Sequence, residues 1–461
     1  MANKCNINVF PLQRKFQTKQ IILHKMNLKK LALAVGLISS TVAFSQETEN
    51  VDTLNWLDQR VTTVEDAIQT SKKLKVSGYI QTEWQSAQID SLGNTPMDLK
   101  VGAGRNDIEK NAKATDINRF GVRRGRIKLA YEDFGCQGVL QFDLTEKGLA
   151  IKDAYLNILD PWIGYFGVKA GLYNRPFGYE IGYSSSSRET PERSRIIQTL
   201  FPDERDLGGM LTIQAPKTSV WNVLKLEAGL FGGNGINTDN DSKKDFIAHL
   251  TYTKSNPQIK YALGASYYNG SIGQLTKNIY SINNNVFTTA AGDSTGFSKR
   301  EYFGFEGQVS FSSAIGVTSL RSEYLLGTQP GSATTSGSPS SKGAFIGAGT
   351  AAADTYIRSF QGGYVNLVQD IADTKHSIVV KYDWYDPNTK IAGDKVGVAG
   401  SKTGKADMAY STLGLGYLYR MNNNVRITAY YDIVSNETTK VKGYFSNVND
   451  NLLTVRLQYK F

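Results

Sequence analysis

The chain has 461 residues with two cysteines, and it carries 52 Lys and Arg against 42 Asp and Glu, a formal charge of +10. Seven of the basic side chains and none of the acidic ones lie in the first 45 residues; the remainder has 45 basic against 42 acidic side chains, which removes the main support for nucleic-acid binding. Cys136 is the one cysteine beyond that segment, which excludes an intrachain disulfide and a cysteine-based metal site there.

Residues 1–45 are expected to be absent from the mature protein. Residues 26–46, MNLKKLALAVGLISSTVAFSQ, begin with two lysines, continue with an apolar run and end in Ala-Phe-Ser before Gln46. This is the plan of a secretory signal peptide, and the run is shorter than the roughly 20 residues of a membrane span. Residues 1–25 are interpreted as an upstream extension with Met26 as the start, the alternative being a long charged n-region.

A short amphipathic helix is expected next, within residues 46–73 on the periplasmic side. Apolar side chains recur there at spacings of three and four: Leu54, Leu57, Val61, Val64 and Ile68. The spacing spans about two heptads, which is marginal for an isolated helix. Packing at the barrel mouth, association of helices in a trimer and a solvated helix all remain open.

From Leu74 onward the hydrophobic period is two, and no later stretch indicates a helix. In HSIVVKYDWY, Ile378, Val380 and Tyr382 alternate with polar residues. Sixteen such runs are predicted as strands, near 74–86, 118–132, 136–146, 149–159, 163–173, 208–215, 223–233, 245–254, 258–269, 300–312, 317–327, 356–369, 375–385, 408–421, 424–435 and 451–461. An even number of amphipathic strands of this length predicts an all-β fold, a sixteen-stranded antiparallel transmembrane β-barrel over residues 74–461.

The connections between these strands alternate in length. Seven periplasmic connections are short, at 133–135, 160–162, 215–221, 255–257, 313–316, 370–374 and 422–423. Seven outside connections are long, at 87–117, 174–207, 234–244, 270–299, 328–355, 386–407 and 436–450, and the one short exception is at 146–148. Barrels of the outer membrane of Gram-negative bacteria have this asymmetry, whereas a soluble β-sandwich has no reason for it.

The last strand alternates apolar and polar residues up to Phe461. It resembles the closing strand of outer-membrane barrels, in which the terminal aromatic residue is part of the assembly signal. The resemblance implies that Phe461, together with Tyr459, is recognised by the barrel-assembly machinery. An edge strand of a soluble sandwich is the alternative interpretation.

Five segments occur in an order that resembles one family: FGVRRGRIKLAYEDFGCQGVLQFDL (120–144), IKDAYLNIL (151–159), VKAGLYNRPFGYE (168–180), YSSSSRETPERS (183–194) and DERDLGGMLTIQ (203–214). Together they are similar to the phosphate-selective porin O and P family. The resemblance implies a sixteen-stranded outer-membrane channel that is usually a homotrimer and that passes small solutes or inorganic anions.

The third outside connection, 174–207, is expected to fold into the lumen, as this loop does in general porins. It contains five arginines and no lysine: Arg175, Arg188, Arg193, Arg195 and Arg205. Guanidinium groups bind oxyanions with planar pairs of donors. The same loop carries six carboxylates, so three interpretations remain open: arginines that fix the loop to the wall, an anion-selective constriction, and a general or cation-preferring channel.

Alternation also assigns wall residues to the lumen. Placing Ile127 in the lipid sends Arg126 and Lys128 inward, with Arg124 beside them unless Gly125 marks a bulge. The same phase sends Lys381, Arg321, Arg426, Arg456 and Lys460 inward, together with Glu83, Asp143, Asp153 and Asp383. The predicted pore path is therefore basic but not purely so.

The predicted function is a porin, a passive diffusion channel in the outer-membrane lipid for small hydrophilic solutes, with anion or phosphate selectivity through the Arg-rich loop. A barrel-anchored surface binding or adhesion protein is the alternative. An enzyme is not expected, because His249 and His376 are the histidines beyond residue 45 and neither lies near a nucleophile motif. No cofactor, metal or nucleic-acid partner is expected.

Overall fold

The structure is a computed structural model that describes residues 60–61, 73–88, 96–101, 116–239, 241–291, 296–338 and 353–461. The chain divides into two units, 1–66 and 67–461, and the second contains the strands described below. The expected signal peptide lies outside the described residues, as does the expected helix within 46–73 apart from Arg60, Val61 and Lys73. None of the described helices is long and apolar enough to cross a membrane.

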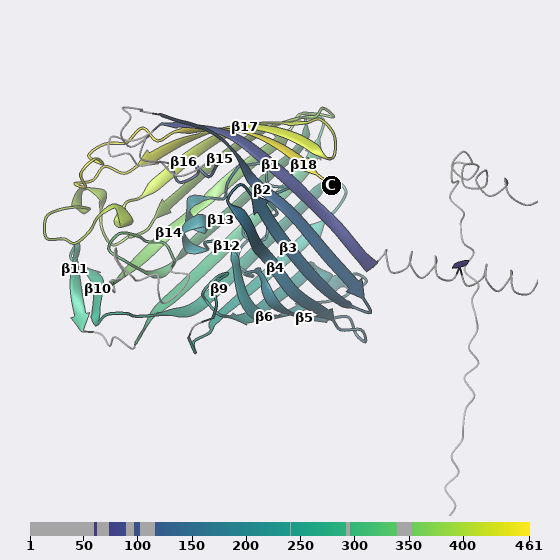
Figure 1. The fold of residues 1–461 in the computed structure, drawn as a ribbon, viewed down its shortest axis with the longest axis horizontal. Helices are drawn as coiled ribbons and strands as arrows, with labels where there is room; N and C mark the ends of the chain where they lie inside the picture. Colours follow the sequence, from purple (N-terminus) through teal and green to yellow (C-terminus); the bar gives the residue numbers. More distant parts are fainter. Residues whose placement is uncertain are drawn as a thin grey trace, which may run out of the picture. The chain divides into compact units, whose positions relative to one another are not determined.

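Sixteen strands form a closed antiparallel β-barrel (Figure 1). They are β1 (Leu74–Gln88), β2 (Asp116–Asp133), β3 (Cys136–Thr145), β4 (Gly148–Leu159), β5 (Phe166–Asn174), β6 (Arg205–Gln214), β7 (Leu224–Phe231), β8 (Asp245–Ser255), β9 (Ile259–Gly273), β12 (Phe297–Ser313), β13 (Gly316–Gly331), β14 (Thr355–Asp370), β15 (His376–Asp386), β16 (Tyr410–Arg420), β17 (Val425–Asn436) and β18 (Leu452–Lys460). The sixteen-stranded fold predicted from the alternation is confirmed.

The ring closes where the first strand meets the last. β1 pairs with β18 from Tyr79 opposite Lys460 to Ala87 opposite Leu452. Beyond this register, Gly78 and Phe461 exchange two backbone hydrogen bonds of 3.0 Å. A side chain at residue 78 would overlap the Phe461 ring, because a Cβ there would lie 2.5 Å from it. Gly78 of β1 therefore leaves the space in which the Phe461 ring packs.

The outer face of the barrel is apolar and the inner face is polar. On β15, Ile378 and Tyr382 are 48% and 47% exposed, whereas Lys381 and Asp383 on the opposite face are buried. On β18, Leu457 is half exposed and Arg456 is buried. A closed barrel satisfies its backbone hydrogen bonds internally and presents an apolar surface to lipid, which is the architecture of an outer-membrane β-barrel.

Two elements of the outside connections differ from the expectation. The connection between β9 and β12 forms a hairpin of β10 (Asn278–Asn283) and β11 (Val286–Ala291), and β10 runs parallel to the start of β14. The connection between β5 and β6 contains α4 (Arg195–Leu200), although no helix was expected after Leu74. The two strands of the hairpin and the helix have six residues each, and stretches so short carry no clear period.

Two β-bulges interrupt the alternation of the wall. In the pairing of β1 with β2, Gln81 lies opposite Arg124 and Thr82 opposite Val122, which leaves Arg123 as an extra residue. In the pairing of β3 with β4, Gln141 lies opposite Asp153 and Phe142 opposite Ile151, which leaves Lys152 extra. A bulge re-aims the side chain of its extra residue, and here both extra residues are cations.

Candidate pore constriction

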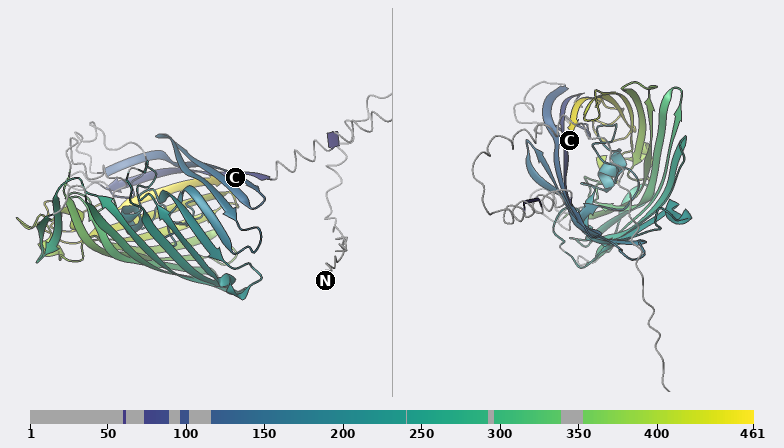
Figure 2. Two further views of the ribbon diagram at one scale, coloured as in Figure 1. Left: turned by 90° about the horizontal axis from the view of Figure 1, so that it is seen from below. Right: turned by 90° about the vertical axis from the view of Figure 1, so that its right-hand side faces the viewer.

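The connection between β5 and β6, residues 175–204, folds back into the barrel and lies within its lumen (Figure 2). We call it the constriction loop. Its first part is tied to β9, where the Gly178 amide donates to Ser266 Oγ at 2.9 Å. Its middle is tied to β1, where the Gln81 amide group donates to the Ser185 carbonyl at 2.9 Å. The loop therefore contacts walls that lie on different sides of the lumen.

A small hydrophobic core anchors the constriction loop inside the barrel. Its six apolar side chains from the loop are Phe177, Ile181, Ile196, Ile197, Leu200 and Phe201. The Phe201 ring lies 4.9 Å from the Phe177 ring and 5.7 Å from the Tyr302 ring of β12. α4 has no side-chain cap, so the burial of its apolar side chains, rather than capping, stabilises this short helix.

Glu192 is the polar anchor of the constriction loop. Its carboxylate accepts hydrogen bonds from Arg123 Nε at 2.7 Å and from an Arg124 Nη at 3.0 Å, both on β2. Arg456 of β18 lies 3.5 Å from the same carboxylate, and Arg188 lies 4.0 Å from it. One buried carboxylate thus compensates four guanidinium groups from three segments of the chain.

Three more carboxylates of the loop pair with cations. Glu180 accepts from Lys381 Nζ of β15 at 2.7 Å, and Glu189 accepts from Arg321 of β13 at 2.9 Å. Glu204 pairs with Arg193 and with Arg205. Together with Glu192, these contacts connect the loop to β2, β13, β15 and β18.

Four of the five arginines predicted for this loop are used inside it or against the wall, and one of these four, Arg205, is the first residue of β6 instead of a loop residue. Arg175 pairs with Asp206 at 3.2 Å, and Arg205 pairs with Asp153 of β4 at 2.7 Å. Arg188 donates to the carbonyls of Thr190 and Pro191. Arg193 donates to the carbonyls of Glu180, Ile181 and Tyr183 in addition to Glu204. Each of these guanidinium groups is buried and bonded.

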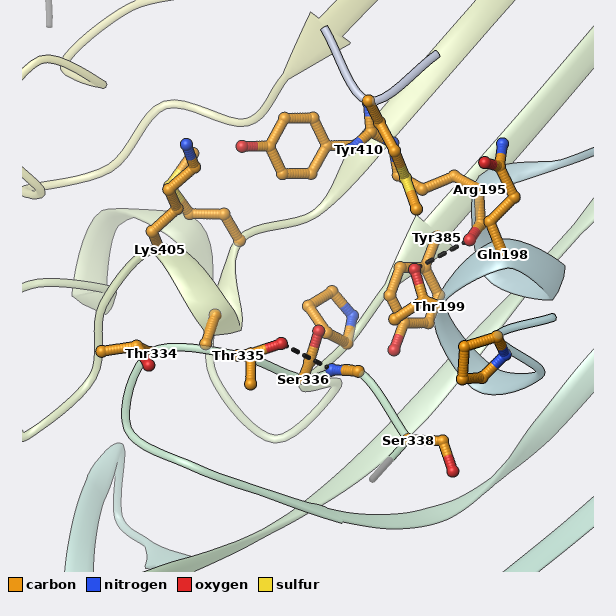
Figure 3. A pocket seen from close by; sticks show the side chains of 16 residues that line it. Arg195, Gln198, Thr199, Thr334, Thr335, Ser336, Ser338, Tyr385, Lys405 and Tyr410 are labelled. Atoms are coloured by element: carbon orange, nitrogen blue, oxygen red, sulfur yellow. Dashed lines mark hydrogen bonds between the residues drawn. The ribbon is translucent and has the colours of Figure 1, made fainter. Parts of the chain in front are cut away.

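Arg195 differs from the other four. Its guanidinium carbon lies 4.1 Å from the centre of the Tyr410 ring, a cation–π contact. Within the described residues its side chain makes no hydrogen bond and no ion pair, and its Nε is buried without a partner. Arg195 lines a pocket together with residues 334–338 and 405–410, which belong to outside connections and the start of β16 (Figure 3). Nη1 of Arg188 is also buried without a partner, but Arg188 has two bonded donors, whereas the Arg195 side chain has none in the described residues.

The predicted wall cations lie on the inner face of the barrel. Arg124, Arg126 and Lys381 are buried, and Lys128 is half-buried opposite Gln141. Arg126 lies 3.4 Å from Asp143 and donates to Ser185 Oγ at 3.2 Å. Gly125 does not form a bulge; the bulge lies at Arg123, which leaves Arg124 pointing inward.

A basic pocket of about 280 Å³ lies between the constriction loop and strands β2 to β4. Six cations line it: Lys100, Arg123, Arg124, Arg126, Lys152 and Arg193. Four carboxylates line it as well: Asp143, Glu192, Asp203 and Glu204. The extra residues of both bulges belong to this set, so the bulges concentrate positive charge in one part of the lumen.

Sequence reasoning missed Arg123 and Lys152, because strict alternation gives no sign of a bulge. It also missed Arg300, which pairs with Asp245, and Arg358, which donates to Asp407 at 2.8 Å. Both arginines are fully buried among the outside ends of the strands. The alternation of their strands places them on the inner face, and nothing else in the sequence distinguishes them.

The two histidines lie apart. His249 Nε2 is 3.2 Å from Glu306, and His376 Nδ1 is 2.6 Å from the Tyr417 hydroxyl. Within the described residues no group of three or more His, Cys, Asp and Glu side chains is placed to hold a metal ion.

Attachment of the constriction loop by Glu192 is expected to depend on pH. Burial raises the pKa of Glu192, but Arg123 and Arg124 outweigh it and hold that pKa well below its ordinary 4.5. A carboxyl group whose pKa is lower in the folded than in the unfolded protein stabilises the folded state. This contribution is fully present above the unfolded-state pKa and is lost as the pH falls through the folded-state pKa. Protonation of Glu192 in strong acid removes its ion pairs with the wall, so we expect the conductance to become larger and noisier there. Conductance and noise that stay unchanged in strong acid, in planar bilayer recordings, would contradict this assignment.

Comparison with known proteins shows the fold. No family model matches this chain, and no curated protein matches it. Among solved structures, OprB of Pseudomonas putida is similar with a TM-score of 0.51 and 9% identity, covering 88% of this chain and 97% of that one. OmpF of Salmonella typhi has a TM-score of 0.47 and 13% identity, covering 84% and 97%. At these identities the likeness concerns the barrel fold alone.

Proposed function

We propose that the chain is a porin, a passive diffusion channel in the outer membrane of a Gram-negative bacterium. The observation that carries this proposal is the constriction loop, which lies in the lumen and is fixed by an apolar core and by ion pairs to the wall. A barrel that serves only as an anchor for surface loops has no use for such a loop. Conductance through the purified protein tests the proposal: stepwise openings support it, and a silent barrel favours surface binding or adhesion.

We further propose that the channel prefers anions. Support comes from the basic pocket beside β2 and from Arg195, whose guanidinium lies at the loop without a carboxylate partner in the described residues. Binding in a selective channel must replace part of an ion's hydration and still allow release. The resemblance of residues 120–214 to phosphate-selective porins makes phosphate one candidate among these anions.

Variants of Arg193 and Arg195 test ion selectivity and attachment of the loop separately. In a KCl gradient we expect a reversal potential that indicates Cl⁻ preference, and we expect Arg195→Ala to move it towards zero at nearly unchanged conductance. Arg193→Ala is the matched variant: it removes bonds to Glu204 and to three carbonyls, so its main effect should be on conductance and noise. Cation preference of the unmodified channel would refute the anion proposal.

Assembly and oligomeric state complete the proposal. Three neighbouring strands, β5, β6 and β7, are short, with nine, ten and eight residues, against 17, 16 and 16 in β12, β13 and β14. We propose that a homotrimer packs through these short strands, so that conductance appears in groups of three equal steps. Insertion in single steps would contradict this oligomeric state.

We also propose that the barrel-assembly machinery recognises Phe461 and Tyr459, whose half-exposed rings lie 6.2 Å apart. Unchanged assembly of a Phe461→Ala variant would contradict that role.

A further inference from the structure

A second pocket lies above the constriction loop, on the side of the outside loops (Figure 3). Its volume is about 340 Å³, in the range of small-molecule sites. Three segments form its walls: α4 of the constriction loop, residues 334–338 after β13, and residues 405–410 before and at the start of β16. A solute that enters from outside meets this pocket beside α4. We call it the entry pocket.

The charge of the entry pocket has one sign. Among the lining residues that the structure describes, the charged side chains are Arg195 and Lys405, and none is a carboxylate. The nearby carboxylates Asp98 and Asp383 bond elsewhere, to the Gln198 side-chain amide and to the backbone amide of Arg195. In Figure 3 the two cations lie on opposite sides of the pocket, with Tyr410 along the rim between them. This distinguishes the entry pocket from the basic pocket, whose cations share the site with four carboxylates.

The rest of the lining is suited to a carbon skeleton with hydroxyl groups. Seven side chains with a hydroxyl group line the entry pocket: Thr199, Thr334, Thr335, Ser336, Ser338, Tyr385 and Tyr410. Five apolar side chains line it as well: Met97, Pro202, Pro387, Ala406 and Met408. An inorganic anion gains nothing from apolar walls or from an aromatic ring, whereas the C–H face of a sugar-like skeleton packs on both. Ligand sites combine such apolar surface with a few polar groups that set orientation.

We propose that the entry pocket binds small polyhydroxylated carboxylates, the chemical class of sugar acids, before they pass the constriction. The inference rests on the proposed channel function and names its substrate class. Arg195 presents a planar pair of donors to the carboxylate while Tyr410 supports the other side of the guanidinium. Lys405, whose ammonium also lies 5.2 Å from the Tyr444 ring, adds charge from the opposite side, and the hydroxyl side chains bind the hydroxyl groups of the solute.

Block of the KCl current by gluconate tests the proposal, with glucose as the neutral probe of similar size. Added on the side of the outside loops, gluconate is expected to block the unmodified channel at concentrations at which glucose does not. Arg195→Gln and Lys405→Gln should each raise the half-blocking concentration by about tenfold, the usual effect of one charge-assisted hydrogen bond. Lys402→Gln is the matched control, because Lys402 lies in the same outside connection but contacts the Tyr280 ring instead of the pocket.

Arg195→Lys separates recognition from charge. It keeps the positive charge and loses the planar fork, so gluconate block should weaken although the charge of the pocket is the same. Equal block by gluconate and glucose in a Cl⁻-preferring channel would overturn the inference and leave the proposed function standing. If the barrel is silent, calorimetry with gluconate on the detergent-solubilised protein decides: binding that is lost in Arg195→Gln supports the entry pocket, and no binding overturns it.

Discussion

Replacement of Glu192 by alanine is expected to free the constriction loop and to raise the single-channel conductance. The change leaves Arg123, Arg124 and Arg188 without their shared carboxylate. Removal of one partner from a buried ion pair costs about 3–5 kcal/mol, because the remaining charge is uncompensated. The wall keeps its backbone hydrogen bonds, so this cost falls on the attachment of the loop rather than on the barrel.

Two further variants sharpen this experiment. Glu192→Gln keeps the shape of the side chain and removes its charge, so we expect a conductance between those of the alanine variant and the unmodified channel. Asp394→Ala is the control: it breaks the pair with Lys395, in which both side chains are more than half exposed, and such pairs contribute little. Equal conductance of Glu192→Ala and the unmodified channel would show that Glu192 does not hold the loop.

Replacement of Phe201 by alanine is expected to loosen the loop from its apolar side. Phe201 is 1% exposed and contacts Phe177 and Tyr302. A buried Phe→Ala substitution costs about 3–5 kcal/mol through lost burial and the cavity that it leaves. The loop contains several arginines, so trypsin cleavage of the folded barrel measures how often the loop opens.

The cleavage rate of Phe201→Ala should exceed that of the unmodified protein by more than about a hundredfold, since about 1.4 kcal/mol corresponds to a factor of ten. Phe445→Ala is the matched control, because Phe445 is 62% exposed in an outside connection. A cleavage rate that rises equally in both variants would mean that the apolar core does not limit opening.

The barrel was predictable because one physical rule governs every strand. Lipid outside and polar groups inside impose a period of two, and that period is visible in runs such as HSIVVKYDWY, which became β15. The position of the constriction loop followed from counting strands. α4 and the strands β10 and β11 were not predictable, because each has only six residues and depends on the packing around it.

The partners of the charged residues were not predictable from alternation. The alternation along β2 correctly places the side chains of Arg124 and Arg126 in the lumen. It places the Arg123 side chain on the lipid side, whereas a β-bulge brings this side chain to Glu192. Alternation also cannot separate Arg193 from Arg195, which lie on either side of the start of α4. Their difference comes from the three-dimensional path of the loop, which surrounds Arg193 with carbonyls and leaves Arg195 at the entry pocket.

The contacts of Glu192 also depend on the closure of the barrel. Arg124 lies on β2 and Arg456 on β18, the two strands that flank β1, and Arg456 also pairs with Glu83 of β1 itself. These guanidinium groups come together only after the first and last strands have met. The complete set of Glu192 contacts therefore requires a closed ring. The carboxylate that holds the loop in the lumen thus also joins the first and last parts of the barrel wall to each other.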